Sequence, residues 1–105
     1  MNKELQKKLK EIAKRLKKEY GAQKVILYGS YARGEETEDS DTDLFVIAQT
    51  DAPIYEKMAT AKKLIRDLRN GLPVSIIVFT SEEIEKKVKD RDAFITTIME
   101  KGVAL

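Results

Sequence analysis

Hydrophobic residues in the first twenty positions recur at steps of three and four, which is the spacing of one face of an α-helix. The residues of this face are Leu5, Leu9, Ile12, Leu16 and Tyr20. Gly21 follows directly, where a residue in the left-handed conformation commonly ends a helix. The pattern predicts an amphipathic helix whose opposite face carries lysines.

Short apolar runs further along the chain predict three buried strands, at residues 25–28, 44–48 and 74–79. Gly29 ends the first run, and Asp43 leads directly into the second. Between these two runs, residues 30–34 have the length of one helical turn. Residues 35–43 are too acidic to be buried, so we expect a loop there.

Helical spacing returns between the second and third strands. Asp51 and Pro53 are typical of a helix start, and Asn70-Gly71 is typical of a helix end. The apolar face of this helix is expected to pack on the core and consists of Ile54, Met58, Ala61, Leu64, Ile65 and Leu68.

Two more helices are predicted after the third strand. The residues from Thr80 to Glu83 have the sequence of a capping box, which begins a helix. A last helix is expected between Asp92 and Gly102, with a buried face made of Phe94, Ile95, Ile98 and Met99. This order of helices and strands predicts an α/β fold in which helices cover one small sheet.

Composition limits the size of the fold and its chemistry. A chain of 105 residues suffices for a single domain, residues 1–105, with one core. The sequence contains no cysteine and no histidine. Disulfides, thiolate nucleophiles and imidazole bases are therefore excluded. Any catalysis must use carboxylates, hydroxyls, lysine, arginine or cations bound by oxygen.

Charge is nearly balanced over the whole chain but is segregated along it. The formal net charge is +2. Residues 1–24 carry nine bases and three acids, whereas residues 35–43 carry six acids and no base. The basic face of the first helix is interpreted either as solvated surface or as a contact surface for a partner or for phosphates.

The sequence also predicts where the protein works. No apolar run is long enough to span a membrane, and residues 1–10 lack the apolar segment of a secretory signal. We therefore expect a cytoplasmic protein with no membrane partner. Aromatic residues make up 7% of the chain and do not alternate with the bases, so nucleic acid is not an expected partner.

The turn after the first strand has the residue types of a phosphate site. Gly29 lets a ligand approach the backbone closely, because glycine has no Cβ. Free N–H groups at the start of a helical turn, together with the Ser30 hydroxyl, suit a phosphate oxygen. Arg33 is the one base between Lys24 and Lys57, and its guanidinium is suited to clamp a triphosphate.

Two aspartates, Asp41 and Asp43, stand at the entrance to the second strand. Strand alternation puts both carboxylates on one face, with Cα atoms ~6–7 Å apart. Two acids at this separation repel each other unless a cation lies between them. Mg²⁺, or Mn²⁺ in its place, is the expected cation, because Mg²⁺ is bound by a few carboxylates plus water and substrate phosphates.

The stretch that carries these residues resembles the nucleotidyltransferase superfamily that includes DNA polymerase beta. The resemblance is strongest to the minimal nucleotidyltransferases, which are small stand-alone members from bacteria and archaea. It is carried by residues 27–34, with the sequence LYGSYARG, and by residues 39–46, with the sequence DSDTDLFV. The strand near residues 72–80 and the closing segment 98–105 extend it over nearly the whole chain.

The resemblance implies a palm-like fold of the polymerase beta type, a small mixed sheet with helices packed on it. It also implies that a nucleoside triphosphate binds with Mg²⁺, and members of the family generally use ATP. In such enzymes the Gly29-Ser30 turn holds the β- and γ-phosphates, and Asp41 and Asp43 are the catalytic metal ligands. A nucleoside monophosphate, here AMP, passes to an acceptor hydroxyl and pyrophosphate leaves. This chemistry needs positioning and neutralisation of charge rather than a reactive side chain.

Ser75 departs from the family pattern. Family members carry a third carboxylate at this position of the next strand, and a serine hydroxyl is neither an anionic ligand nor a base at neutral pH. Three interpretations stay open. The protein binds nucleotide without turnover, or it turns over slowly with two aspartates, or a loop acid supplies the missing carboxylate. The loop acids concerned are Glu35, Glu36, Glu38 and Asp39.

The resemblance also implies an alternative function of a different class. Many minimal nucleotidyltransferases form a complex with a small helical HEPN-type protein, as the antitoxin of a toxin–antitoxin pair. Adenylylation of a partner tyrosine accompanies this in some members. The basic first helix or the C-terminal helices would then be the contact surface. A homo-oligomer is the other expected assembly.

Overall fold

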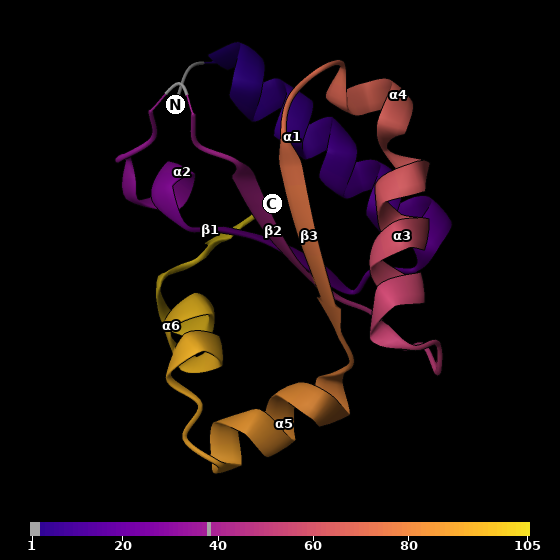
Figure 1. The fold of residues 1–105 in the computed structure, drawn as a ribbon, viewed down its shortest axis with the longest axis vertical. Coiled ribbons are helices and arrows are strands. Elements are labelled where there is room, and N and C mark those ends of the chain that lie inside the picture. Colours follow the sequence, from indigo (N-terminus) through magenta and orange to yellow (C-terminus); the bar gives the residue numbers. More distant parts are fainter. Residues whose placement is uncertain (1–2, 38) are drawn as a thin grey trace.

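The structure is a computed structural model that describes residues 3–37 and 39–105. Its first half contains α1 (Lys3–Arg15), the π-helical segment η1 (Leu16–Tyr20), β1 (Lys24–Tyr28), α2 (Ser30–Arg33) and β2 (Thr42–Ile47). Its second half contains α3 (Ile54–Leu64), α4 (Arg66–Arg69), β3 (Val74–Phe79), α5 (Ser81–Lys89), α6 (Ala93–Lys101) and β4 (Val103–Ala104). Figure 1 shows the strands at the centre, with helices on either side.

The strands form one mixed sheet in the order β3-β2-β1-β4. β1 pairs antiparallel with both β2 and β4, whereas β2 and β3 are parallel, with α3 and α4 in the crossover between them. The predicted α/β fold with a small mixed sheet is confirmed. The sequence pattern does not predict β4, because a strand of two residues is too short to show a period.

Each face of the sheet packs against its own helices, because side chains alternate along each strand. On one face, α1, η1 and α3 bury a core that includes Leu9, Ile12, Leu16, Val25, Leu27, Leu44, Val46, Ala61, Ile65, Ile76 and Val78. On the other face, α5 and α6 bury a smaller core of Ile26, Phe45, Ile47, Ile84, Ile95 and Ile98. Figure 1 shows α5 and α6 together at the lower end of the strands.

The helix predicted between the second and third strands differs from the observed one in two respects. It breaks at Ile65 into α3 and α4, and Ile54 is 53% exposed. Lys57 is buried instead, with its ammonium 3.0 Å from the Glu83 carboxylate. Glu83 also accepts the N–H of Thr80 in the predicted capping box of α5. Lys57 is tolerated inside because its aliphatic chain packs and its charge is paired.

For the last helix, α6, half of the predicted buried face is confirmed. Ile95 and Ile98 are buried, whereas Phe94 and Met99 are 50% and 40% exposed. α6 packs its Ile95 and Ile98 side chains onto the face of the sheet, and Phe94 and Met99, each next to one of them in the sequence, point partly away from that contact. Gly102 ends the helix as predicted, and a Cβ there would overlap the Ile26 side chain. No helix in the described ranges is long and apolar enough to cross a membrane.

Candidate active site

Gly29 makes the turn that joins β1 to α2. Its φ of 79° and ψ of −155° fall in a region that only glycine enters readily. A Cβ built at this position would overlap the Asp43 carboxylate. Ser30 follows as the first residue of α2. The turn identified from the sequence is therefore a tight one, with its backbone directly against Asp43.

Asp43 lies in the middle of a row of three side chains on neighbouring strands. It pairs with Tyr28 of β1 on one side and with Ser75 of β3 on the other. All three residues are half-buried. By strand alternation they share the face of Phe45, which α5 and α6 cover further along the sheet. The sheet thus brings Asp43 beside Ser75, the position of the missing carboxylate.

The acidic segment is shorter than the sequence pattern predicts. β2 begins at Thr42, so Asp43 belongs to the strand and not to the loop. The strand extends this far because Thr42 and Asp43 both pair with β3. Thr42 itself is fully buried. Since neighbours alternate along a strand, Asp43 faces the opposite side, where the surface is only partly covered.

The Asp43 carboxyl is electrostatically strained. Burial raises its pKa, the nearby Asp41 carboxylate raises it further, and the Arg33 guanidinium lowers it. Asp41 is exposed in the segment just before β2. The two aspartates are therefore close enough for Asp41 to repel Asp43, although Asp41 lies before the strand and not within it.

Tyr28 is a part of the site that sequence reasoning missed. Burial, together with the Asp43 charge, raises the pKa of its phenol to about 12, so the hydroxyl stays protonated at neutral pH. Its ring meets the rings of Phe45 and Phe94 edge to face, at centroid distances of 6.5 and 5.7 Å. In the sequence, the one sign that Tyr28 belongs to the site is its position directly before Gly29, at the end of the apolar run of residues 25–28.

Arg33 lies at the rim of the site, at the end of α2. Its side chain is exposed, and Nε lies 3.3 Å from a Glu35 carboxylate oxygen. It is still near enough to Asp43 to lower the pKa of that carboxyl. The structure therefore puts Asp43 against Gly29 on one side and beside Ser75 on the other, with Arg33 and Asp41 near enough to shift the pKa of Asp43.

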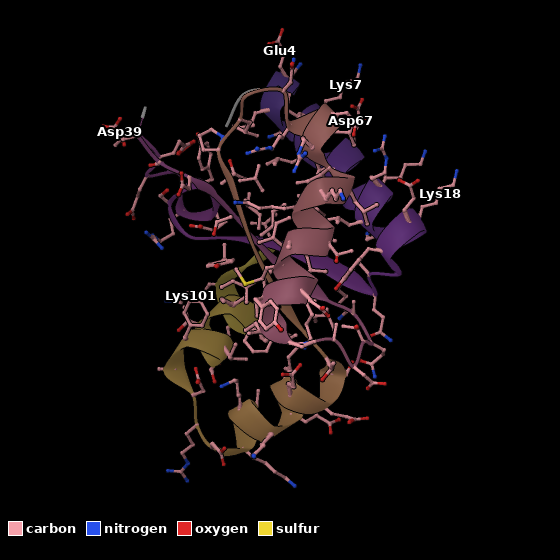
Figure 2. The ribbon with its side chains drawn as sticks, turned by 45° about the vertical axis from the view of Figure 1, so that its right-hand side comes forward. Glu4, Lys7, Lys18, Asp39, Asp67 and Lys101 are labelled. Atoms are coloured by element: carbon pink, nitrogen blue, oxygen red, sulfur yellow. The ribbon has the colours of Figure 1, made fainter. Side chains whose placement is uncertain are left out.

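The described loop acids do not complete a group of three carboxylates. Glu35 pairs with Arg33. Asp39 is exposed, and Figure 2 shows it at the outer edge of the molecule. Glu36 is half-buried, and Glu38 lies outside the described residues. In the part of the chain that the structure describes, no three carboxylates, histidines or cysteines gather to hold a metal ion.

The donor set suits Mg²⁺ when substrate phosphates share the coordination. Asp41 and Asp43 offer two carboxylates, and Ser75 offers a neutral hydroxyl beside them. Mg²⁺ sites that bind phosphates commonly use one or two carboxylates and keep several waters. The mutual repulsion of the two aspartates is the kind of cost that a bound cation removes.

We expect Asp43→Asn to leave the metal-free protein as stable as the wild type, or more so, at neutral pH. The folded-state pKa of Asp43 is raised, so ionisation of this carboxyl disfavours the fold. The penalty fades as the pH falls through the folded-state pKa and is gone below the ordinary value of 3.8. Urea unfolding in EDTA between pH 7 and pH 3.5 measures this. A variant less stable than the wild type at pH 7 would show that Asp43 is structural.

Comparison with known proteins places these residues in a family context. The model of the nucleotidyltransferase domain family matches residues 9–105. A protein of Methanocaldococcus jannaschii, provisionally named a protein adenylyltransferase, is 36% identical over 107 residues, covering 100% of this chain and 99% of its own. A second protein of that organism with the same provisional name is 35% identical over 81 residues, covering 77% of this chain and 79% of its own.

A solved structure agrees in fold. A protein from Sulfolobus solfataricus, provisionally described as a nucleotidyltransferase, aligns with a TM-score of 0.58 at 22% identity. The alignment covers 93% of this chain and 76% of that one. At this identity the likeness concerns the arrangement of strands and helices alone.

Proposed function

This chain belongs to the nucleotidyltransferase domain family, and on that premise we propose that it binds ATP with Mg²⁺ and transfers AMP to an acceptor hydroxyl. The observation that carries the proposal is the strand register, which puts Asp43 between the Gly29 turn and Ser75. The provisional name of the relatives supports AMP as the transferred group and a protein as the acceptor.

Each group in the site has a role in this proposal. The backbone at Gly29 and the Ser30 hydroxyl receive the β- and γ-phosphates, since no Cβ blocks the approach. Arg33 at the rim exchanges Glu35 for a phosphate oxygen. Asp41 and Asp43 hold Mg²⁺, which when bound neutralises charge on the phosphate oxygens.

The reaction itself is a substitution at the α-phosphorus. The acceptor oxygen forms a bond to phosphorus, the bond to the bridging oxygen breaks, and pyrophosphate leaves with the electron pair. The acceptor proton passes to solvent, because the Ser75 hydroxyl is not a base at neutral pH. Slow turnover follows from this arrangement.

Ser75 also favours a second candidate function, nucleotide binding without turnover. The site then keeps its phosphate turn and two aspartates, and among the described residues no third carboxylate joins them to activate an acceptor. Such a protein would act through a partner, as the antitoxin of a HEPN pair does. The exposed lysines of α1 and η1 offer a surface for it, and Figure 2 shows Lys7 and Lys18 pointing outward.

Two measurements test the proposal: the melting temperature of the protein with and without ATP and Mg²⁺, and the transfer of AMP to an acceptor. We expect ATP with Mg²⁺ to raise the melting temperature, and EDTA, Asp41→Asn or Asp43→Asn to abolish the shift, because the carboxylate pair then has no cation. Incubation with α-labelled ATP and candidate acceptors measures transfer. No melting shift, together with no heat of binding in calorimetry, would remove the nucleotide function. Binding without labelled product would assign the protein to the second candidate.

A further inference from the structure

A cavity of about 450 Å³ opens beside the Gly29 turn, between α2 and α6. Figure 1 shows these two helices one above the other at the left of the strands. The cavity is lined mainly by apolar groups: the rings of Tyr28 and Phe94, together with Ala32 and Ile98. Its volume lies within the range of about 300–1,000 Å³ that is typical of small-molecule sites.

Phe94 gives this cavity an aromatic wall. Its ring is 50% exposed, although a large apolar side chain gains free energy from burial. The Tyr28 ring meets it edge to face at 88°, which favours this orientation of the Phe94 ring. An oriented and half-exposed ring is a stacking surface for a flat ligand, and stacking on an aromatic side chain is a common way to bind a nucleobase.

The positions of the polar groups in the lining suit the phosphates and polar atoms of a nucleotide. Gly29 lines the cavity and also makes the proposed phosphate turn, so the two sites are continuous. Arg33 and Lys101 contribute two cations from opposite walls, and Thr97 contributes a hydroxyl. Figure 2 shows Lys101 on the side of the molecule that also carries the acidic loop with Asp39. A ligand that is flat at one end and anionic at the other complements this lining.

We propose that the cavity between α2 and α6 is the nucleobase site, with Phe94 as the stacking residue. The inference rests on the proposed function and adds to it the location of the base. The sheet order β3-β2-β1-β4 puts the cavity on the β1 side of Asp43 and Ser75 on the β3 side. The base and the acceptor hydroxyl therefore approach the reacting phosphate from different sides.

Titration calorimetry with two probes in saturating Mg²⁺ tests this, since ATP carries a base and inorganic tripolyphosphate does not. We expect the wild type to bind ATP more tightly than tripolyphosphate. Phe94→Ala should weaken ATP binding roughly tenfold and leave tripolyphosphate unchanged. Thr97→Phe, which fills the cavity from an exposed position, should do the same. Tyr55→Ala, which removes a 70% exposed ring on α3, is the control and should change neither affinity.

Each contrary result has one meaning. Equal wild-type affinity for both probes would overturn the base site and leave the phosphate site standing. Equal weakening of both probes in Phe94→Ala would show that this ring acts through the fold, which also overturns the inference. Unchanged ATP affinity in both variants would overturn the base site. If the wild type binds neither probe, the proposed function fails with the inference.

Discussion

Ser75→Asp is expected to raise the rate of AMP transfer on the order of 100-fold, which is typical of adding a positioned base. The parallel register pairs residue 75 with Asp43, so the new carboxylate lies beside the existing one. There it can accept the proton of the acceptor hydroxyl and provide a third anionic ligand. Transfer of label from α-labelled ATP, followed in single-turnover mode, measures the effect.

The same substitution should change stability in the opposite sense. A third carboxylate next to Asp43 increases like-charge repulsion, so the metal-free melting temperature should fall and the shift caused by Mg²⁺ with ATP should grow. Ser75→Asn is the matched control, because it has the shape of aspartate without the charge. It should leave both the rate and the Mg²⁺ response near wild type.

Two results would contradict this prediction. Equal rates for the wild type and Ser75→Asp would show that two aspartates suffice for catalysis. Equal gains in Ser75→Asp and Ser75→Asn would show that shape, and not charge, is limiting at this position.

Gly29→Ala is expected to abolish nucleotide binding and to destabilise the fold by about 1–3 kcal/mol. The backbone at this position lies in a region that side chains rarely enter, and the added methyl group would overlap the Asp43 carboxylate. Relief of that overlap must move either the turn or Asp43, and both belong to the proposed site. Urea unfolding and ATP calorimetry measure the two effects.

Gly34→Ala provides the control for the backbone contribution. Gly34 also has a positive φ, 72°, but a Cβ there meets open space. It should lower stability by ~1 kcal/mol, the cost of the left-handed conformation, and leave ATP binding intact. Combining Gly29→Ala with Asp43→Ala should recover part of the lost stability in metal-free buffer. No recovery would show that the overlap with Asp43 does not contribute.

Much of this fold follows from local sequence patterns. The three central strands, the capping box of α5 and the helix end at Gly21 are read from runs, spacing and end signals that involve only nearby residues. The exposure of Phe94 and the burial of Lys57 cannot be predicted from such local signals, because each depends on a partner distant in the chain. These partners are Tyr28 for the first and Glu83 for the second.

The candidate site divides in the same way. The residue types at Gly29, Asp41 and Asp43 predict a site for phosphate and a cation from the sequence alone. The neighbouring positions of Asp43 and Ser75 depend on the register of a parallel pair, which no local spacing encodes. The cavity between α2 and α6 depends on where the last helix docks, and the pattern of that helix alone would have buried Phe94 fully.

The antiparallel pairing of β1 with β2 determines which parts of the proposed site can vary independently. The phosphate turn and both aspartates lie on one hairpin-like segment, whereas Ser75 reaches it only through the α3–α4 crossover. A substitution at residue 75 therefore changes the surroundings of Asp43 without changing the sequence of the hairpin. The groups proposed to bind the nucleotide and the position of the missing carboxylate thus lie on separate pieces of chain, so one substitution can vary the second while the Gly29 turn and both aspartates stay in place.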